Sequence, residues 1–221
     1  MKVLLFGATG MVGQGVLREC LLAADVEQVL AIGRAPTGQT DSKLRNLVHA
    51  DLFDYRAIEA ELAGFDACFF CLGVSSVGMA EAPYTRLTYD LTLVAAEVLA
   101  RLNPQMAFTY VSGAGTDSTE EGASMWRRVK GRTENAVRRL FTNAYMFRPG
   151  IIVPLNGVRS KTTAYRAAYA ILRPLLPLLQ IVMPGQLVTT EEVGLAMLAV
   201  ARHDWPAAVL EIADIRAAAR S

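Results

Sequence analysis

The sequence predicts an α/β fold, a doubly wound and mostly parallel sheet between two layers of helices. Short apolar runs alternate with amphipathic helical stripes through the first two thirds of the chain. The runs are apolar on both faces, which is typical of strands buried in a parallel sheet. A glycine-rich turn joins the first run to the first stripe, and no fixed-period repeat indicates another architecture.

The strand-like runs are short and apolar, and each is followed by a turn or a helical pattern. A weaker candidate comes near the end of the chain. The predicted strands are Lys2–Phe6, Gln28–Ile32, Leu47–His49, Ala67–Cys71, Met106–Val111, Ala144–Arg148 and Ala208–Ile212.

Helical stripes lie between these runs and repeat near 3.6 residues. Right-handed crossover helices between parallel strands would give the doubly wound arrangement. The stripes are Val12, Val16, Leu17, Cys20 and Leu21 in the first helix, Leu87, Leu91, Val94, Val98 and Leu102 in the second, and Trp126, Val129, Thr133, Val137 and Leu140 in the third.

The pattern loosens after Pro149. We expect helices near Thr162–Leu179 and Glu191–Ala201, the second started by a capping box of Thr189 and Glu192. One core can hold up to about 250 residues, so we expect a single domain over residues 1–221, with 150–221 contributing substrate-side helices and the last strand.

Composition excludes several classes of partner. With 52% hydrophobic residues, 19% charged residues and a net charge of +1, the chain shows no bias toward nucleic acid. The most apolar stretch, Ala167–Met183, is interrupted by Arg173, Pro174 and Pro177, so we expect no integral membrane segment. The N-terminus lacks the pattern of a signal peptide, and the cysteines lie in apolar segments as buried thiols, which together predict a cytoplasmic protein.

The glycine turn follows the first strand directly and reads Gly7-Ala8-Thr9-Gly10-Met11-Val12-Gly13. Glycines spaced by three at a strand-to-helix turn allow a tight turn, close approach of the backbone to a pyrophosphate, and close packing of helix on strand. The phosphates would lie at the positive helix N-terminus. Although the spacing differs from the usual GxGxxG, its position between a strand and a helix predicts a Rossmann-type dinucleotide site.

The end of the second strand indicates which dinucleotide. Arg34 stands where an acid would bind the ribose hydroxyls of NAD. A guanidinium suits a 2′-phosphate, so NADP(H) is preferred, with NAD(H) as the alternative. Asp51 and Leu52 follow the third strand, where they are candidates for the adenine edge, although Asp51 is equally well read as an ordinary loop residue.

Several motifs in one order resemble the atypical and extended short-chain dehydrogenases. They are the glycine turn, Gly33-Arg34, Val111-Ser112-Gly113-Ala114, Lys130 and Arg148-Pro149-Gly150. The likeness spans nearly the whole chain and is greatest to the small Tat-interacting oxidoreductase-like group. It implies a Rossmann fold and a nicotinamide cofactor, and leaves the substrate open.

The resemblance also implies catalytic residues. In this superfamily a serine at the end of the fifth strand holds the substrate oxygen, and a Tyr-x-x-x-Lys pair supplies the acid and its support; Ser112 and Lys130 match by position. Trp126 stands in the tyrosine's place, and its indole cannot exchange a proton near neutral pH. Lys130 is expected to bind the nicotinamide ribose, and Trp126 to pack or to stack on substrate. Gly73 and Pro149 are expected beside the cofactor.

No residue is a clear substitute for the missing acid. Tyr84, Tyr89 and Tyr110 are the candidates, none with a fixed orientation. His49 and His203 belong to no ligand cluster, so no metal site is predicted. The segment around Ser112 lacks the first glycine of a nucleophile elbow, which argues against a serine hydrolase.

The sequence is compatible with two functions. One is an NADP(H)-dependent oxidoreductase or epimerase-like enzyme that acts on an unknown small carbonyl or hydroxyl compound. The alternative is a catalytically weak or inactive NADPH-sensing protein that regulates a partner. Loss of the tyrosine favours the sensor, whereas retention of Ser112 and Lys130 favours the enzyme. A protein partner or a homodimer is left open.

Overall fold

The computed structural model describes residues 1–158, 185–203 and 205–221. A seven-stranded sheet runs in the order β3-β2-β1-β4-β5-β6-β9, and all its pairs are parallel. The predicted α/β class is therefore confirmed. The strands are β1 (Lys2–Phe6), β2 (Gln28–Gly33), β3 (Leu44–Val48), β4 (Ala67–Phe70), β5 (Ala107–Val111), β6 (Ala144–Phe147) and β9 (Val209–Leu210).

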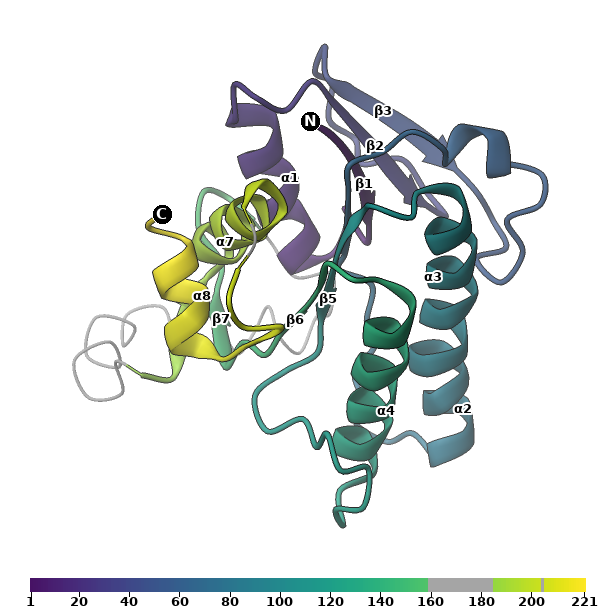
Figure 1. Ribbon diagram of the computed structural model, residues 1–221, viewed down its shortest axis with the longest axis vertical. Helices are drawn as coiled ribbons and strands as arrows, with labels where there is room; N and C mark the ends of the chain where they lie inside the picture. Colours follow the sequence, from purple (N-terminus) through teal and green to yellow (C-terminus); the bar gives the residue numbers. More distant parts are fainter. Residues whose placement is uncertain (159–184, 204) are drawn as a thin grey trace.

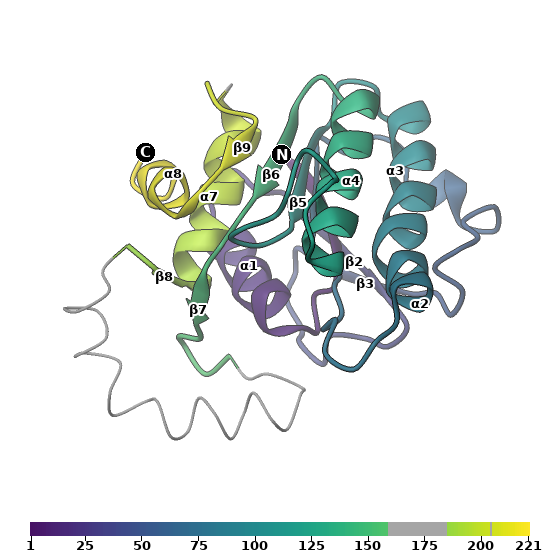
Figure 2. The same cartoon turned by 90° about the horizontal axis from the view of Figure 1, so that it is seen from below.

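Helices cover both faces of this sheet (Figures 1 and 2). One layer contains α1 (Met11–Leu22), α7 (Thr190–Arg202) and α8 (Ile212–Ala218). The other contains α2 (Glu81–Thr85), a π-turn η2 (Arg86–Asp90), α3 (Leu91–Leu102) and α4 (Met125–Leu140). A short 3-10 helix, η1 (Glu59–Glu61), precedes β4, and β7 (Ile151–Val153) pairs in parallel with β8 (Leu187–Thr189) outside the main sheet.

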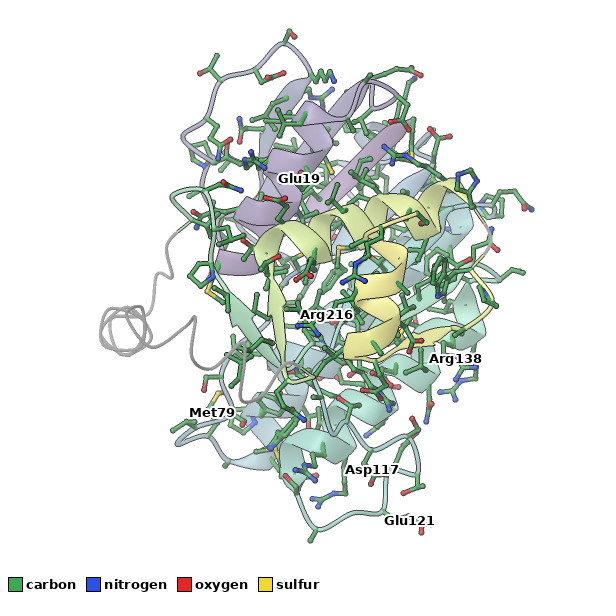
Figure 3. All side chains as sticks on the ribbon, turned by 90° about the vertical axis from the view of Figure 1, so that its left-hand side faces the viewer. Glu19, Met79, Asp117, Glu121, Arg138 and Arg216 are labelled. Atoms are coloured by element: carbon green, nitrogen blue, oxygen red, sulfur yellow. The ribbon has the colours of Figure 1, made fainter. Side chains whose placement is uncertain are left out.

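The first layer is held together by close contact between α1 and α7. A Cβ at Gly15 would lie 2.6 Å from the Cβ of Thr190, and one at Gly194 would lie 2.7 Å from the Cγ of Glu19. Figure 3 shows α7 between α1, where Glu19 is labelled, and α8, where Arg216 is labelled. The glycines thus let the late helix α7 pack on the helix that follows the glycine turn.

Most predicted elements lie within a few residues of their expected bounds. The strand expected at Leu47–His49 begins earlier, at Leu44, and the last strand is only the pair Val209–Leu210. The capping box is confirmed, since Thr189 N–H donates to Glu192 Oε2 at 2.7 Å and Glu192 N–H donates to Thr189 Oγ1 at 3.0 Å. The helix expected at Thr162–Leu179 lies outside the described residues.

The second helical stripe is confirmed except at its first residue. The stripe residues of α3 are partly buried against the core, beside the fully buried Thr92, Ala95, Ala96 and Leu99; they are Leu91, Val94, Val98 and Leu102. Leu87 is 37% exposed, because it lies in the π-turn, whose wider turns rotate it relative to α3. No helix within the described parts of the chain is long and apolar enough to cross a membrane.

Candidate dinucleotide and reaction site

The carboxyl ends of the parallel strands bring the predicted cofactor residues to one edge of the sheet. There a cavity of about 580 Å³, here called the nucleotide cavity, opens between the loops that follow β1, β2, β3 and β4. This volume is within the range of ordinary ligand sites. Among the residues that line the cavity are the predicted Gly7, Thr9, Arg34, Asp51, Leu52 and Gly73.

The glycine turn has a different steric requirement at each glycine. Gly7 has φ +78°, and a Cβ there would lie 2.7 Å from the carbonyl oxygen of Cys71. A Cβ at Gly13 would collide with the backbone of Gly7. At Gly10 an added Cβ would meet only the carbonyl oxygen of Gly7, at 3.3 Å. Gly7 and Gly13 therefore serve packing, whereas Gly10 leaves space open beside the turn.

This space lies at the start of α1. Gly10 caps the helix without a side-chain hydrogen bond, and the first turn, Met11 to Gly13, contains no acidic residue. The N–H groups of a first helical turn have no partner within the helix and carry its positive end. Thr9 lines the nucleotide cavity, whereas the following predicted residues, Gly10, Met11, Val12 and Gly13, do not. A pyrophosphate therefore fits the open space at Gly10.

The far side of the cavity carries the specificity candidates. Arg34 is exposed at the end of β2 and makes no ion pair with any of the described residues. Asp51 accepts a hydrogen bond from Phe53 N–H at 2.9 Å through Oδ1 and so shapes its own turn. The guanidinium is thus free to meet an anionic group at the cavity.

Ser112 and Lys130 lie together at the end of β5. The Lys130 ammonium donates to the carbonyl oxygen of Ser112. The Ser112 side chain donates to the carboxylate of Glu134, and Ser112 is only 5% exposed. Its Oγ is also 3.1 Å from the carbonyl oxygen of Phe147. While its proton is on Glu134, the Ser112 hydroxyl can hold a substrate oxygen only by accepting a hydrogen bond from a substrate hydroxyl.

Trp126 is half-buried one turn before Lys130 on α4. Its Cζ3 is 4.0 Å from the position that a Cβ on Gly113 would occupy, and the guanidinium carbon of Arg127 is 5.5 Å from the centre of its ring. The indole therefore lies beside the strand-end glycine that follows Ser112. This position fits either packing or stacking on a substrate.

The three tyrosines that could replace the missing acid are either buried or covered by another side chain. Tyr84 and Tyr110 are each 1% exposed, and burial raises the pKa of both phenols. Tyr89 lies under Arg132, whose guanidinium carbon is 4.2 Å from the ring centre. None of these phenols lines the nucleotide cavity.

Pro149 does not line the cavity either. It is buried after β6, and its carbonyl oxygen accepts a hydrogen bond from Ala114 N–H at 2.9 Å. This bond ties the loop after β5 to the turn after β6. Pro149 therefore lies beside the loop that contains Ser112.

The sequence reading missed Glu134 and the bonding role of Arg148. Arg148 Nε donates to Glu134 Oε1 at 3.0 Å and Arg148 Nη2 to Glu134 Oε2 at 2.5 Å. A signal for Glu134 was present, because it lies four residues after Lys130 and beside Thr133 of the buried stripe. A carboxylate on the inner face of a helix requires a partner.

A second cavity, of about 490 Å³, lies at the opposite edge of the sheet, at the amino ends of β4, β5 and β6. Asn103 in its wall accepts hydrogen bonds from Gly64 N–H at 2.7 Å and Phe65 N–H at 3.0 Å. Ligands of open parallel sheets bind at the carboxyl ends of the strands. The site is therefore assigned to the nucleotide cavity. Within the described ranges, no group of three or more His, Cys, Asp or Glu side chains could hold a metal ion.

A parallel sheet ordered about a central β1, with a glycine turn and a cavity at its carboxyl edge, defines a Rossmann-type dinucleotide-binding protein. The NAD-dependent epimerase/dehydratase family matches residues 3–123, which is more than half of the chain. The chain therefore belongs to this family, among the extended short-chain dehydrogenases.

Solved structures show the same fold at low sequence identity. UDP-N-acetylglucosamine 4-epimerase from Methanobrevibacter ruminantium M1 is 16% identical, with a TM-score of 0.69 over 92% of this chain and 74% of that one. UDP-glucuronic acid 4-epimerase from Bacillus cereus, in complex with NAD, is 13% identical, with a TM-score of 0.68 over 93% and 75%. The Bordetella bronchiseptica enzyme WbmF, in complex with NAD+, is 16% identical, with a TM-score of 0.66 over 98% and 76%. No curated protein sequence matches the chain significantly.

Proposed function

We propose that the protein binds NADP(H) and is an oxidoreductase or epimerase-like enzyme that acts on a small carbonyl or hydroxyl substrate. The observation that carries the cofactor preference is Arg34, an exposed guanidinium without an ion pair among the described residues, at the strand end that borders the nucleotide cavity. A 2′-phosphate would accept paired, charged hydrogen bonds from it. An acid that would favour NAD is absent from the Gly33-Arg34 strand end.

The remaining cofactor contacts follow from the positions of the residues. We assign the adenine edge to Asp51 and Leu52, the pyrophosphate to the backbone of Thr9 to Gly13, and the ribose nearer the nicotinamide to Gly73 and Lys130. The cofactor, when bound, supplies hydride transfer. The ammonium has three donors, and Ser112 takes one of them, so Lys130 retains two N–H groups for a ligand.

At the reaction end we assign Ser112 and Lys130 to the substrate and cofactor, and Pro149 to the backbone wall beside them. Residues 1–221 would form one domain in which 150–221 provide the substrate side. Two contacts support a single domain: β9 joins the main sheet by pairing with β6, and α7 packs on α1. The likeness to the Tat-interacting group stays a prediction.

The second candidate function is an NADPH sensor with little or no turnover. It is favoured by Trp126, which fills the position of the family's acid, and by the Ser112 hydroxyl, which is bonded to Glu134. Both functions need the same cofactor. They differ in whether a carbonyl substrate oxidises bound NADPH.

The test of the proposed function is a calorimetric titration of NADPH and NADH into the wild type and Arg34→Asp. Loss of a charged hydrogen bond removes about 1.5–3 kcal/mol, so Arg34→Asp should weaken NADPH roughly 10- to 150-fold and change NADH binding far less. Arg138→Asp is the matched control, because Arg138 is exposed in the last turn of α4 (labelled in Figure 3) and does not line the cavity. Equal wild-type affinities for NADPH and NADH would contradict the proposed preference.

A further inference from the structure

Side chains of one helix, α4, bind two of the three polar groups of Ser112, its carbonyl oxygen and its hydroxyl. Lys130 donates to the carbonyl oxygen of this residue, and Glu134, one turn later on α4, accepts the proton of its hydroxyl. The Ser112 hydroxyl is also 3.1 Å from the carbonyl oxygen of Phe147, but the charged carboxylate is the stronger acceptor, so we assign the hydroxyl proton to Glu134. The end of β5 is therefore clamped between two side chains of α4.

Arg148 donates to both carboxylate oxygens of Glu134. The two side chains form a paired charged contact, and they are only 11% and 1% exposed. Arg148 also donates to Ser118 Oγ at 2.6 Å and to Glu211 Oε1 at 3.2 Å. Thus the carboxylate that accepts from Ser112 is fixed by a guanidinium that contacts the loop before α4 and the residue that caps α8.

The proposed reaction chemistry places no demand on Glu134, because this buried carboxylate faces Ser112 and Arg148 rather than the nucleotide cavity. A buried ion pair is seldom retained for stability alone, since desolvation offsets most of its attraction. The position of Glu134 next to the Ser112–Lys130 contact suggests a role in the site.

We propose that Glu134, held by Arg148, is the positioning residue of this site: through the Ser112 hydroxyl it fixes the strand-end carbonyl that binds the Lys130 ammonium. The inference rests on the proposed function, in which Lys130 binds the cofactor. It adds that the orientation and charge of Lys130 depend on a residue that touches neither cofactor nor substrate.

Electrostatics agree with this geometry. Burial lowers the pKa of Lys130 to about 8, and the Glu134 carboxylate opposes that shift. Among the described residues, the charged group nearest this pair is Arg148, from the end of β6. The phenols of Tyr84 on α2 and Tyr110 on β5 have a pKa raised by burial and are neutral in this range.

The experiment is an NMR titration of the lysine side chains in the whole protein, observed at 13Cε. The chain has only four lysines, and Lys130→Met assigns the signal of Lys130. We expect the titration midpoint of Lys130 to fall in the order wild type, Glu134→Asp, Glu134→Gln, with the Gln variant lower by about one unit, the scale of a nearby opposite charge. Glu97→Gln, on the exposed side of α3, is the control and should match the wild type.

Coincident midpoints in the wild type and Glu134→Gln, or an equal shift in Glu97→Gln, would overturn the inference. If circular dichroism shows that Glu134→Gln does not fold, Glu134→Asp decides alone, and a midpoint equal to the wild type's overturns it. NADPH is titrated into the same samples. A wild type that fails to bind NADPH would refute the proposed function, while the lysine titration would still test the positioning role.

Discussion

At the scale of single residues, burial shifts the pKa values of the ionisable groups in and around the candidate site. Lys130 lies in a buried setting that makes its ammonium a stronger acid than an ordinary lysine, because burial lowers its pKa to about 8. Tyr84 and Tyr110 have the opposite shift, since burial raises the pKa of a phenol. These buried tyrosines are therefore poor substitutes for the acid that is missing at Trp126.

Replacing the tryptophan tests that absence directly. Trp126→Tyr would place a phenol one turn before Lys130, whose positive charge favours the phenolate. General acid–base catalysis contributes about 10²–10⁴-fold, so NADPH oxidation by small aldehydes, ketones or quinones should rise by up to that factor. The measurement is loss of NADPH absorbance under saturating cofactor.

Trp126→Tyr combined with Lys130→Met is the control and should lose the gain. An unchanged rate in the single variant, with NADPH still bound, would mean that a different native proton donor acts or that the protein is a sensor. A wild-type rate above the background without protein then favours a different native donor, and a wild-type rate equal to that background favours the sensor.

At the scale of elements, the nucleotide half of the site could be predicted because its signals are local. Gly7 to Gly13 is one continuous motif, and Arg34 follows a strand that has the expected apolar run. The exposure of Leu87 could not be predicted in the same way. The π-turn at Arg86–Asp90 alters the helical period between Leu87 and α3, and a stripe with a constant 3.6 residues per turn cannot include that change.

The glycine turn gives a prediction that separates binding from folding. Gly10→Val should fold, because a Cβ there meets only one backbone oxygen at 3.3 Å, but it should exclude the pyrophosphate from the start of α1. Losing two charged hydrogen bonds of about 1.5 kcal/mol each would weaken NADPH about 100-fold. Calorimetry measures the affinity, and far-UV circular dichroism the fold.

Gly13→Ala is the contrasting variant, since its Cβ would collide with the backbone of Gly7. It should lower the free energy of unfolding by about 1–3 kcal/mol, the usual effect of overpacking. Normal NADPH binding by Gly10→Val would show that the turn does not hold phosphate.

At the scale of the whole molecule, the proposed reaction end is assembled from segments far apart in the sequence. Ser112 follows β5, Glu134 lies on α4, Arg148 follows β6, and Glu211 caps α8. The resemblance predicted Ser112 and Lys130 as site residues but did not indicate that Glu134 connects them. The reason is physical: a charge on a buried helix face reveals that it has a partner, but only the tertiary fold identifies which residue that is.

The same burial predicts how stability depends on pH. The folded-state pKa of Lys130, about 8, is below its ordinary value of 10.5, so between these limits the unfolded chain binds more protons and the Lys130 contribution to the free energy of unfolding rises with pH. Tyr110 and Cys71 act in the opposite sense, because burial raises their pKa values and the unfolded chain loses those protons first.

Denaturant unfolding of the wild type alone would mix the effects of Lys130 with those of Tyr110 and Cys71. The difference between wild type and Lys130→Met isolates the lysine, and we expect it to shift in favour of the wild type by roughly 1–3 kcal/mol from pH 7 to pH 10.5. A difference that stays constant with pH would show that the ammonium is not held in a buried site.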